Sequence, residues 1–498
     1  MAFSRRELLA SGAAAAATPL STGAAGAGAS TTEPAAVLRG TIAAGAPDFV
    51  YLPVDVPPGT GELRVSYTYD RPAVPPGTPG NALDIGLFDQ RGTALGGRGF
   101  RGWSGGARSE FFVRADAATP GYLPGPLDPG RWWIALGPYT VAPQGLAYEV
   151  TVTLLPATGD PAPVAVAAAP PARARGRGRA WYRGDCHLHS AHSDGRLTPA
   201  EIAARARAAG LDFVNASDHN THSPHAEWAA AAGPDLLVLT GEEITTRTGH
   251  VLAVGTDPGT FVDWRYRSRD NRFGRFAHQI RRAGGLVVPA HPHATCIGCA
   301  WKFGFGEADA VEVWNGPWTP DDEVSLASWD ATLRGGAAAD GREGGRWLPA
   351  LAHSDFHRDP DRVGSPQTVV LAEDLSRPAV LAALRAGRAY GAESSAVTVA
   401  FDVVGARGGR AGIGERLSAG PAEEVLVRLS VTGAGPLELR LVTDQGVAVT
   451  APSATSLEWR TSADRSAYVR AEARRPAQLP PLPGPLVAFT NPVWITSR

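Results

Sequence analysis

Histidine and carboxylate side chains gather in one part of this sequence. Residues 184–195 read GDCHLHSAHSDG, which places three histidines and two aspartates within twelve positions. All twelve histidines of the chain lie between His187 and His357, and the long segments on either side contain none. Histidines scattered through a core or over a surface would not avoid both flanking regions. The distribution therefore indicates a functional site in the middle of the chain.

Most of these histidines follow short apolar segments that are predicted to be strands. In a β/α barrel the carboxyl ends of the strands meet at one rim, so side chains at these positions would converge. Neutral imidazoles and carboxylates are the ligands of Zn²⁺, Mn²⁺ or Fe²⁺, and without a cation they would repel or titrate one another. The sequence thus predicts a metal site. Six carboxylates share the strand-end position with the histidines: Asp194, Asp218, Glu242, Glu243, Glu312 and Asp355.

The elements that must position these residues fall into three regions. Residues 35–155 and 396–498 contain short strand-like runs between Gly- and Pro-rich turns, which predicts a β-sandwich at each end of the chain. Residues 156–180 have the composition of a flexible Pro/Ala/Arg/Gly linker. Residues 181–395 alternate strands with helices, which predicts a parallel barrel or a doubly wound sheet. The expected fold class is α/β with flanking β-sandwiches.

Six motifs in the middle region carry a resemblance to a known family. HLHSAHSDG, ASDHN, GEEIT, GHVLAVG, VVPAHPH and HSDFH occur in this order over roughly residues 181–392 and resemble the motifs of the polymerase and histidinol phosphatase (PHP) metallohydrolases. An ordered set of six is far more specific than any one motif. DHN, VEVWNG and the terminal AFTNPVWI resemble the exported CehA/McbA-type branch. The resemblance implies a distorted (β/α)7 barrel and two to three divalent metal ions (Zn, Mn or Fe) on its rim.

The resemblance also implies which side chains bind the metals. The second glutamate of GEEI, Glu243, matches the position of a bridging ligand, and Glu242 does not. His192, His222, His225 and His278 match no ligand position. His293 and His353 fall within ligand motifs without being expected ligands. The three implied ligand sets are His187, His189, Glu243 and Asp355; Glu243, His250 and His291; and Asp194, His219 and His357.

The expected chemistry is hydrolysis without a covalent protein intermediate. Metals in such a cluster lower the pKa of bound water to about 7, which supplies a hydroxide near neutral pH. The leaving group would be protonated by a metal-bound water or by His293. No Gly-x-Ser-x-Gly elbow surrounds the serines beside these histidines, which argues against a serine hydrolase. The candidate substrate contacts are Arg247, Arg265 and Asn315.

The substrate remains open between a phosphoester and a carboxyl or carbamate ester. Residues 263–275, DWRYRSRDNRFGR, offer arginines for a phosphate, aromatic rings for an aryl leaving group, or simply a solvated loop. The wider family contains phosphoesterases, and the named branch includes hydrolysis of aryl carbamate esters. A third alternative is a non-catalytic cell-surface binding protein, which predicts gaps in the ligand set; the nine positions contain none.

The chain begins with a pattern of a twin-arginine export signal. Residues 1–30 contain SRRELL, an Ala-rich apolar stretch and small residues near Ala29. We therefore expect an exported protein that is extracellular, periplasmic or on the cell surface. No later run of about 20 apolar residues predicts a membrane span.

The net charge limits the classes of binding partner, and the cysteine spacing leaves three possible roles for two thiols. A formal net charge of −2 and no basic stripe argue against nucleic acid as a partner. The expected partner is a small-molecule ester or phosphoester, and the oligomeric state is open. Cys296 and Cys299 are separated by two residues, so they could form a disulfide, bind a metal or remain unpaired thiols.

Overall fold

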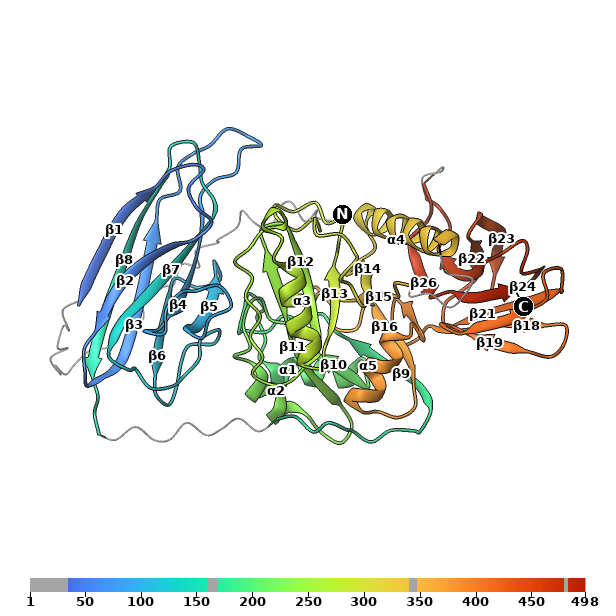
Figure 1. The fold of residues 1–498 in the computed structure, drawn as a ribbon, viewed down its shortest axis with the longest axis horizontal. Helices are drawn as coiled ribbons and strands as arrows, with labels where there is room; N and C mark the ends of the chain where they lie inside the picture. The colour runs from blue at the N-terminus through green and yellow to red at the C-terminus, as the bar shows by residue number, and fades with distance from the viewer. Residues whose placement is uncertain (1–34, 160–168, 340–346, 479–481, 498) are drawn as a thin grey trace, which may run out of the picture.

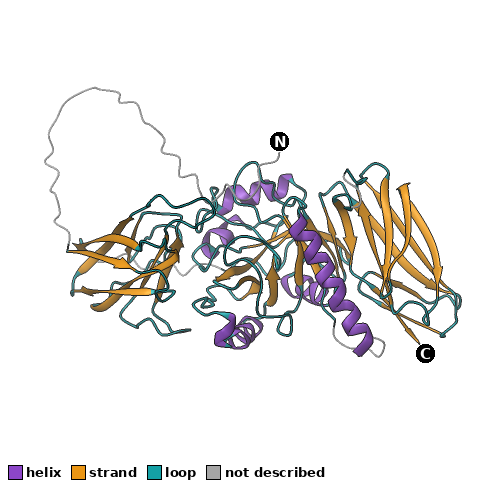
Figure 2. Cartoon of the chain, turned by 90° about the horizontal axis from the view of Figure 1, so that it is seen from above, coloured by secondary structure: helices purple, strands orange, loops and turns teal. Residues whose placement is uncertain are grey.

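The structure is a computed structural model that describes residues 35–159, 169–339, 347–478 and 482–497. Helices gather in the middle of the molecule, and strands dominate both ends (Figure 2). No helix among the described residues is long and apolar enough to cross a membrane. The predicted export signal, residues 1–30, and part of the predicted linker, residues 160–168, lie outside the described residues.

The N-terminal region is a sandwich of two antiparallel sheets (Figure 1). Its strands are β1 (Ala36–Ile42), β2 (Val50–Val56), β3 (Thr60–Tyr69), β4 (Ala82–Phe88), β5 (Phe100–Gly105), β6 (Glu110–Arg114), β7 (Gly130–Thr140) and β8 (Leu146–Pro156). One sheet has the order β1-β8-β3-β6 and the other β2-β7-β4-β5. Apolar side chains alternate along the strands, as Leu63, Val65 and Tyr67 do in β3, and they meet in the core between the sheets.

The middle region holds all five α-helices of the described residues. Its elements are β9 (Ala180–Asp185), α1 (Pro199–Ala208), β10 (Phe213–Asn215), α2 (His225–Ala231), β11 (Leu237–Thr246), β12 (Gly249–Thr256), the short 3₁₀ helix η2 (Ser268–Asp270), α3 (Phe273–Arg282), β13 (Leu286–Ala290), β14 (Val311–Asn315), α4 (Pro320–Ala339), β15 (Ala350–His353), β16 (Gln367–Ala372), α5 (Arg377–Arg385) and β17 (Ala389–Ala392). Helix α1 begins with a capping box: the Thr198 side chain accepts from the Glu201 N–H, and the Glu201 carboxylate accepts from the Thr198 N–H.

The strand directions of the middle region differ from the predicted parallel barrel. β9, β10 and β11 are parallel, but β12 is antiparallel to both β11 and β13, and β16 is antiparallel to both β9 and β17. Only Arg247 and Thr248 separate β11 from β12, and a turn this short joins antiparallel strands only. β14 and β15 form a separate parallel pair. The middle region therefore has mixed sheets and few helices. The strand pairing of its described residues does not form a regular (β/α)7 barrel.

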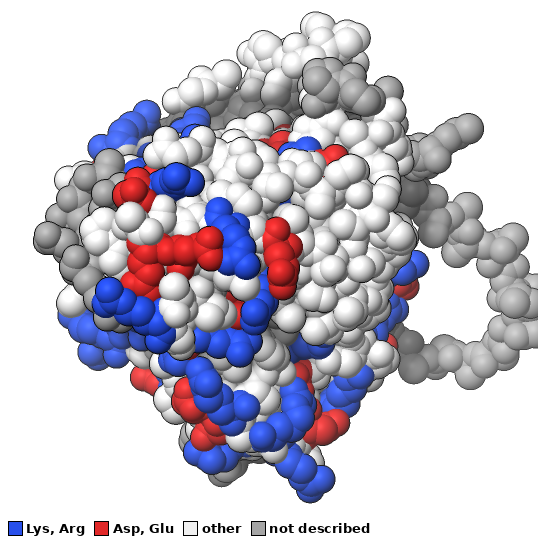
Figure 3. Space-filling model, turned by 90° about the vertical axis from the view of Figure 1, so that its right-hand side faces the viewer, with Lys and Arg blue, Asp and Glu red and all other residues white. Residues whose placement is uncertain are grey.

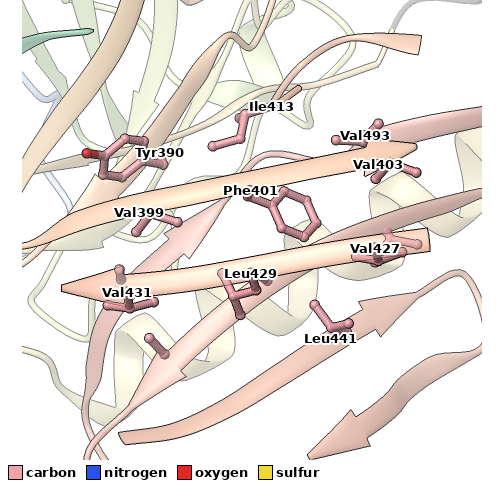
Figure 4. Close-up of a cluster of buried hydrophobic side chains, with 14 of the residues drawn as sticks. Tyr390, Val399, Phe401, Val403, Ile413, Val427, Leu429, Val431, Leu441 and Val493 are labelled. Carbon is pink, nitrogen blue, oxygen red and sulfur yellow. The ribbon is translucent and has the colours of Figure 1, made fainter. Parts of the chain in front are cut away.

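The C-terminal region continues the sheet of the middle region. Its strands are β18 (Thr398–Gly405), β19 (Arg410–Gly412), β20 (Arg416–Ala419), β21 (Val425–Thr432), β22 (Leu437–Thr443), β23 (Gly446–Ala454), β24 (Ser456–Thr461), β25 (Tyr468–Arg474), β26 (Leu486–Thr490) and β27 (Val493–Ser497). β26 pairs with β17, so one 13-stranded sheet runs through both regions. The separate sheet β19-β18-β21-β24 packs on it, and Phe401, Leu429 and Tyr390 lie in the shared core (Figure 4). The two regions predicted to meet at residue 395 therefore share a sheet and a core.

Side-chain contacts reinforce this junction. The fully buried Arg470 pairs with Asp330 of α4 at 2.6 Å, and Arg474 pairs with Glu323 of α4 at 2.8 Å. The buried Asn491 accepts from the Ala350 N–H at 2.8 Å and donates to the Ala350 carbonyl at 3.1 Å. On the outer surface of the C-terminal end, basic and acidic side chains lie beside one another (Figure 3).

Candidate metal centre

The nine side chains expected to bind metal lie together in the middle region. Most follow directly from strand ends, and Glu243 and His250 lie within the β11–β12 hairpin. Their potential ligand atoms form four overlapping groups, and within each group all atoms lie within 4.8 Å of one another. The groups are His189, Asp194, His219 and His357; His187, His189 and Glu243; His187, His291 and Asp355; and Glu243, His250 and His291.

The most buried part of the cluster lies around His187 and His189. The Nε2 atoms of these histidines lie 3.3 and 3.1 Å from Asp355 Oδ1, and 3.3 and 3.4 Å from Glu243 Oε2. All four atoms are buried, and none of them has a hydrogen-bond partner. Buried polar atoms are normally paired, and imidazole nitrogens with carboxylate oxygens around one point are what a divalent cation binds. The residues present therefore fit a metal ion.

The two carboxylate oxygens of Glu243 face different histidines. Oε2 faces His187 and His189, whereas Oε1 lies 3.0 Å from His250 Nδ1 and 3.2 Å from His291 Nε2. A carboxylate in this position can contact two ions at once, as the sequence predicts for Glu243. The neighbouring Glu242 accepts instead from the Val262 N–H, because successive side chains of a strand point to opposite faces.

The third group forms the exposed side of the cluster. Asp194 Oδ1 lies 3.6 Å from His219 Nε2 and 3.4 Å from His357 Nε2. These side chains are 47%, 22% and 27% exposed, whereas His187 and His189 are fully buried. The cluster is therefore open to solvent, and to a substrate, on the side of the third group.

The electrostatics of the cluster require compensating positive charge. Burial opposes ionisation of Glu243, but His219 and His187 hold its pKa well below the usual range. Burial lowers the pKa of His357, but Asp194 and Asp355 raise it to about 10. His219 is raised in the same way, to a pKa of about 9. Without metal, the carboxylates are thus ionised beside protonated imidazoles. Bound divalent cations would supply the positive charge in place of those protons.

Backbone strain also marks the cluster. His291 and Asp355 adopt positive φ angles of 29° and 50°, and Asn220, beside His219, has a φ of 54°. A non-glycine residue in this region is uncommon and is held there only by its surroundings. The carboxylate of Asp185 provides part of this support, because it accepts from the N–H groups of Gly364 and Ser354 on either side of the Asp355 loop.

Glu312 is a supporting residue that the sequence interpretation placed at a strand end without a role. It is fully buried, and its Oε1 lies 3.0 Å from His187 Nδ1 and 2.9 Å from His353 Nδ1. Its Oε2 accepts from the His291 N–H at 2.8 Å and from the Asn315 amide at 3.0 Å. Glu312 therefore orients the imidazole of one cluster histidine, His187, and holds the backbone of another, His291. Its position on β14 could not be related to His187 from sequence spacing.

The residues expected to contact substrate occupy different environments. Arg265 pairs with Asp263 at 2.6 Å and donates to Tyr51 and to the Thr93 carbonyl of the N-terminal sandwich. Asn315 is buried and donates to Glu312. Arg265 therefore contacts the N-terminal sandwich, and Asn315 contacts a residue that supports the metal site. These protein contacts account for both side chains in place of the expected substrate contacts. Arg247 alone of the three keeps unpartnered donors.

The remaining histidines lie outside the four groups. His293, expected as a proton donor, is partly buried in the loop after β13, and burial lowers its pKa, so its ring is neutral near pH 7. His192 bonds to Ser223 and Glu227, His225 bonds to the Gly241 carbonyl, and His353 bonds to Glu312. His278 is exposed on α3.

Cys296 and Cys299 form a disulfide in the loop that follows His291. The Gly298 carbonyl accepts from the Gly249 N–H at 2.8 Å, and Tyr139 of β7 donates to the Ile297 carbonyl. The disulfide loop thus contacts the β11–β12 turn and the N-terminal sandwich at once. Cys186 is a buried free thiol.

Comparison with known proteins gives a short similarity to a phosphatase. No protein-family model matches the chain. A 3′,5′-nucleoside bisphosphate phosphatase of Chromobacterium violaceum is 38% identical over 79 residues, which is 15% of this chain and 28% of that protein. The chain therefore aligns with less than a third of that relative's length.

Solved structures show more distant similarity. A two-domain protein of Bacteroides vulgatus that contains a predicted PHP-like metal-dependent phosphoesterase is 16% identical, with a TM-score of 0.35 over 64% of this chain and 97% of that one. An amidohydrolase of Chromobacterium violaceum with bound sulfate and no metal is 21% identical, with a TM-score of 0.27 over 36% of this chain and 89% of that one.

Proposed function

We propose that this chain is a metal-dependent hydrolase of the PHP type that cleaves phosphoesters with two to three divalent ions. The observation that carries the proposal is the convergence of nine ligand side chains into four overlapping groups, in which the buried ligand atoms around His187 and His189 have no hydrogen-bond partner. The local 38% identity to a bisphosphate phosphatase supports a phosphoester as the substrate class.

The protein's own residues divide the work of such a site. Divalent ions at these positions would polarise the scissile bond and lower the pKa of a coordinated water. Glu243 belongs to two of the groups, and Asp355 lies close to both His187 and His189. Glu312 fixes the orientation of His187. The phosphoester enters on the side of Asp194 and His357, where the cluster is exposed.

The alternatives receive less support from the structure. Trp301, Trp314 and Trp318 follow the ligand motifs closely in the sequence, where aromatic rings could line a pocket for an aryl or carbamate ester. Trp314 and Trp318 pack together in the core beside α4, with ring centroids 5.5 Å apart, and Trp301 packs on Phe303 at 4.8 Å. These contacts explain the tryptophans without an aryl substrate. A non-catalytic binding protein would leave no reason for a complete ligand set.

Assignment to the exported CehA/McbA-type branch is part of this proposal. Its support is the twin-arginine pattern SRRELL together with DHN, VEVWNG and AFTNPVWI. Secretion of the full-length chain, and its loss when Arg5 and Arg6 are both changed to Lys, would test the export route.

Metal content and phosphatase activity test the proposed function together. We expect two to three ions per chain by elemental mass spectrometry, and hydrolysis of p-nitrophenyl phosphate with Mn²⁺ or Zn²⁺ that chelation abolishes and metal restores. His187→Ala/His189→Ala should lose at least one ion and lower kcat/KM more than about 100-fold.

The matched control is His278→Ala, because His278 is exposed and lies outside the cluster. It should keep the metal content and turnover of the native chain. Fewer than two ions per chain, or native turnover in the double variant, would contradict the proposal.

A further inference from the structure

The N-terminal sandwich is docked onto the middle region by specific polar contacts. Arg267 forms an ion pair with Asp48, and the Asp263 carboxylate accepts from the Gly96 N–H at 2.8 Å. Arg265 lies over the Phe88 ring at 4.2 Å and donates to the Thr93 carbonyl at 3.0 Å. Contacts of this kind fix the position of the sandwich, so its residues can contribute to a site in the middle region.

Arg247 lies at the junction between the sandwich and the metal cluster. Glu243 and Thr245 of β11 both contact His219, at 2.8 and 2.6 Å from its Nδ1. Side chains two residues apart on a strand share a face. Arg247 follows Thr245 by two residues, at the start of the turn that joins β11 to β12. Arg247 therefore lies at the end of the strand whose residues Glu243 and Thr245 face the cluster.

The sandwich supplies the surroundings of the Arg247 guanidinium. The Arg247 guanidinium lies 4.2 Å from the ring centroid of Tyr139 of β7, and its Nη2 lies 3.9 Å from Oδ2 of Asp84 of β4. The side chains of Arg247 and Asp84 are only 11% and 17% exposed. Nη1 and Nη2 of Arg247 are buried, and neither has a hydrogen-bond partner. A buried guanidinium with two unused nitrogens is costly unless something else accepts from it.

The pair Arg247–Asp84 offers a donor and an acceptor side by side, with no net charge. At 3.9 Å the two atoms are too far apart to bond each other. Two hydrogen bonds of about 2.8 Å each can bridge this gap through one oxygen that accepts from the arginine and donates to the carboxylate. A hydroxyl group does both, whereas a phosphate or carboxylate would accept from Arg247 but be repelled by Asp84.

We propose that Arg247 and Asp84 bind a hydroxyl group on the alcohol part of the substrate, so that the N-terminal sandwich forms part of the substrate site. This inference rests on the proposed phosphoester hydrolysis and specifies its substrate class as a phosphomonoester of a polyol or sugar. In this arrangement the phosphate would lie at the metal cluster and the bound hydroxyl several bonds away in the alcohol part.

The test compares two phosphomonoesters that differ only in hydroxyl groups: glycerol 3-phosphate and n-propyl phosphate. We expect the native, metal-loaded protein to favour glycerol 3-phosphate about 10- to 100-fold in kcat/KM, the range for hydrogen bonds to charged groups. Asp84→Ala and Arg247→Met should reduce this ratio to about 1–3, mainly through KM for glycerol 3-phosphate. The isosteric Asp84→Asn should give an intermediate ratio, and it carries the test if either larger change impairs folding.

The matched control uses an exposed Arg–Asp pair of the same sandwich. Asp55→Asn and Arg131→Met remove partners that are 79% and 59% exposed and lie 3.1 Å apart, and they should leave the ratio unchanged. A native ratio near 1, or an equal loss for both substrates with a lower unfolding temperature, would overturn the inference.

A third substrate separates a hydroxyl from an anion. If propane-1,3-diyl bisphosphate is preferred over both monoesters and Arg247→Met removes that preference, the ligand is a second anionic group and the inference is wrong. Failure of the native, metal-loaded protein to hydrolyse p-nitrophenyl phosphate would instead overturn the proposed function, whatever the ratio.

Discussion

At the scale of single residues, Glu312 orients the imidazole of His187 so that its Nε2 faces the metal cluster. The His291 N–H and the Asn315 amide donate to one carboxylate oxygen, and the two imidazole Nδ1 atoms lie at hydrogen-bond distance from the other. Burial raises the pKa of Glu312, but His187 and His353 lower it to about 2, so the group is a carboxylate near pH 7. A carboxylate only accepts, so His187 carries its proton on Nδ1 and turns Nε2 to the cluster.

Replacement of this carboxylate should therefore weaken metal binding without removing a ligand. Glu312→Gln places an amide N–H against one pair of donors, and we expect about 10- to 100-fold weaker metal affinity, as for other residues that orient metal ligands. Competition with a chromophoric chelator measures the affinity. Glu307→Gln, at an exposed position that pairs with Arg281, is the control. Equal affinity of Glu312→Gln and the native protein would refute the orienting role.

Residue types and strand-end positions indicated where a metal site would form, and the resemblance to the PHP metallohydrolases implied its nine members, but neither identified the roles of the residues around it. His187 and Asp355 were identifiable because imidazoles and carboxylates at successive strand ends converge wherever the strands do. Arg265 and Asn315 were assigned to substrate because an arginine or amide near a motif has the same appearance whether it faces ligand or protein. The contact of Arg265 with Tyr51 depends on the docking of the sandwich. The contact of Asn315 with Glu312 lies within β14, where the register shifts between Glu312 and Trp314.

At the scale of elements, local sequence signals were sufficient to predict a helix or a turn, but they could not predict which distant strands pair. Helix α1 follows from its capping box and from Pro199 at its first turn. The two-residue turn Arg247–Thr248 indicates that β12 runs antiparallel to β11. The expectation of repeated β/α units led instead to a prediction of parallel strands. The pairing of β17 with β26 joins residues about a hundred positions apart, and no local pattern specifies such a pair. The predicted boundary at 395 lies in the loop after β17, and it therefore assigns strands of one sheet to two regions.

The disulfide loop is an element whose integrity should matter to the metal centre. Cys296–Cys299 follows the strained His291, and the loop contacts the turn that carries Arg247. A bridge that closes so short a loop stabilises the folded chain by about 2 kcal/mol in the chain-entropy estimate. We expect Cys296→Ser/Cys299→Ser to lower the unfolding free energy by this amount and to weaken binding of the ion held by Glu243, His250 and His291.

Urea unfolding and metal stoichiometry measure these two effects. A reducing agent should shift the native protein toward the double-serine variant and leave that variant itself unchanged, which separates the disulfide from other effects of the reductant. Native stability and full metal content in the double-serine variant would contradict this role of the loop.

At the scale of the whole molecule, the two flanking regions attach to the middle region in different ways. The C-terminal region shares a sheet, a core and the buried Arg470–Asp330 and Arg474–Glu323 pairs with it. The N-terminal sandwich has its own two sheets with a core between them, and among the described residues it shares no strand pairing with the middle region. It does share a second buried apolar cluster with that region, in which Phe100 and Trp103 pack with Trp264. The first attachment thus continues a sheet, and the second packs two sets of sheets against each other.

Two truncations should separate these attachments. A chain that ends at residue 395 loses β26 beside β17 and leaves the Ala350 and Ala389 backbone groups without Asn491. Unpaired buried polar groups and an exposed apolar core each cost several kcal/mol, which is comparable to the whole stability of a domain. We therefore expect no cooperative thermal unfolding and no bound metal. A chain that begins at residue 169 keeps that sheet complete but exposes the apolar cluster around Trp264. It should therefore still unfold cooperatively, at a lower temperature than the native chain, and bind two to three ions while it loses the preference for glycerol 3-phosphate. Circular dichroism melts and metal analysis of both truncations measure the difference, and a cooperatively folded, metal-binding chain that ends at residue 395 would show that the shared sheet is not required.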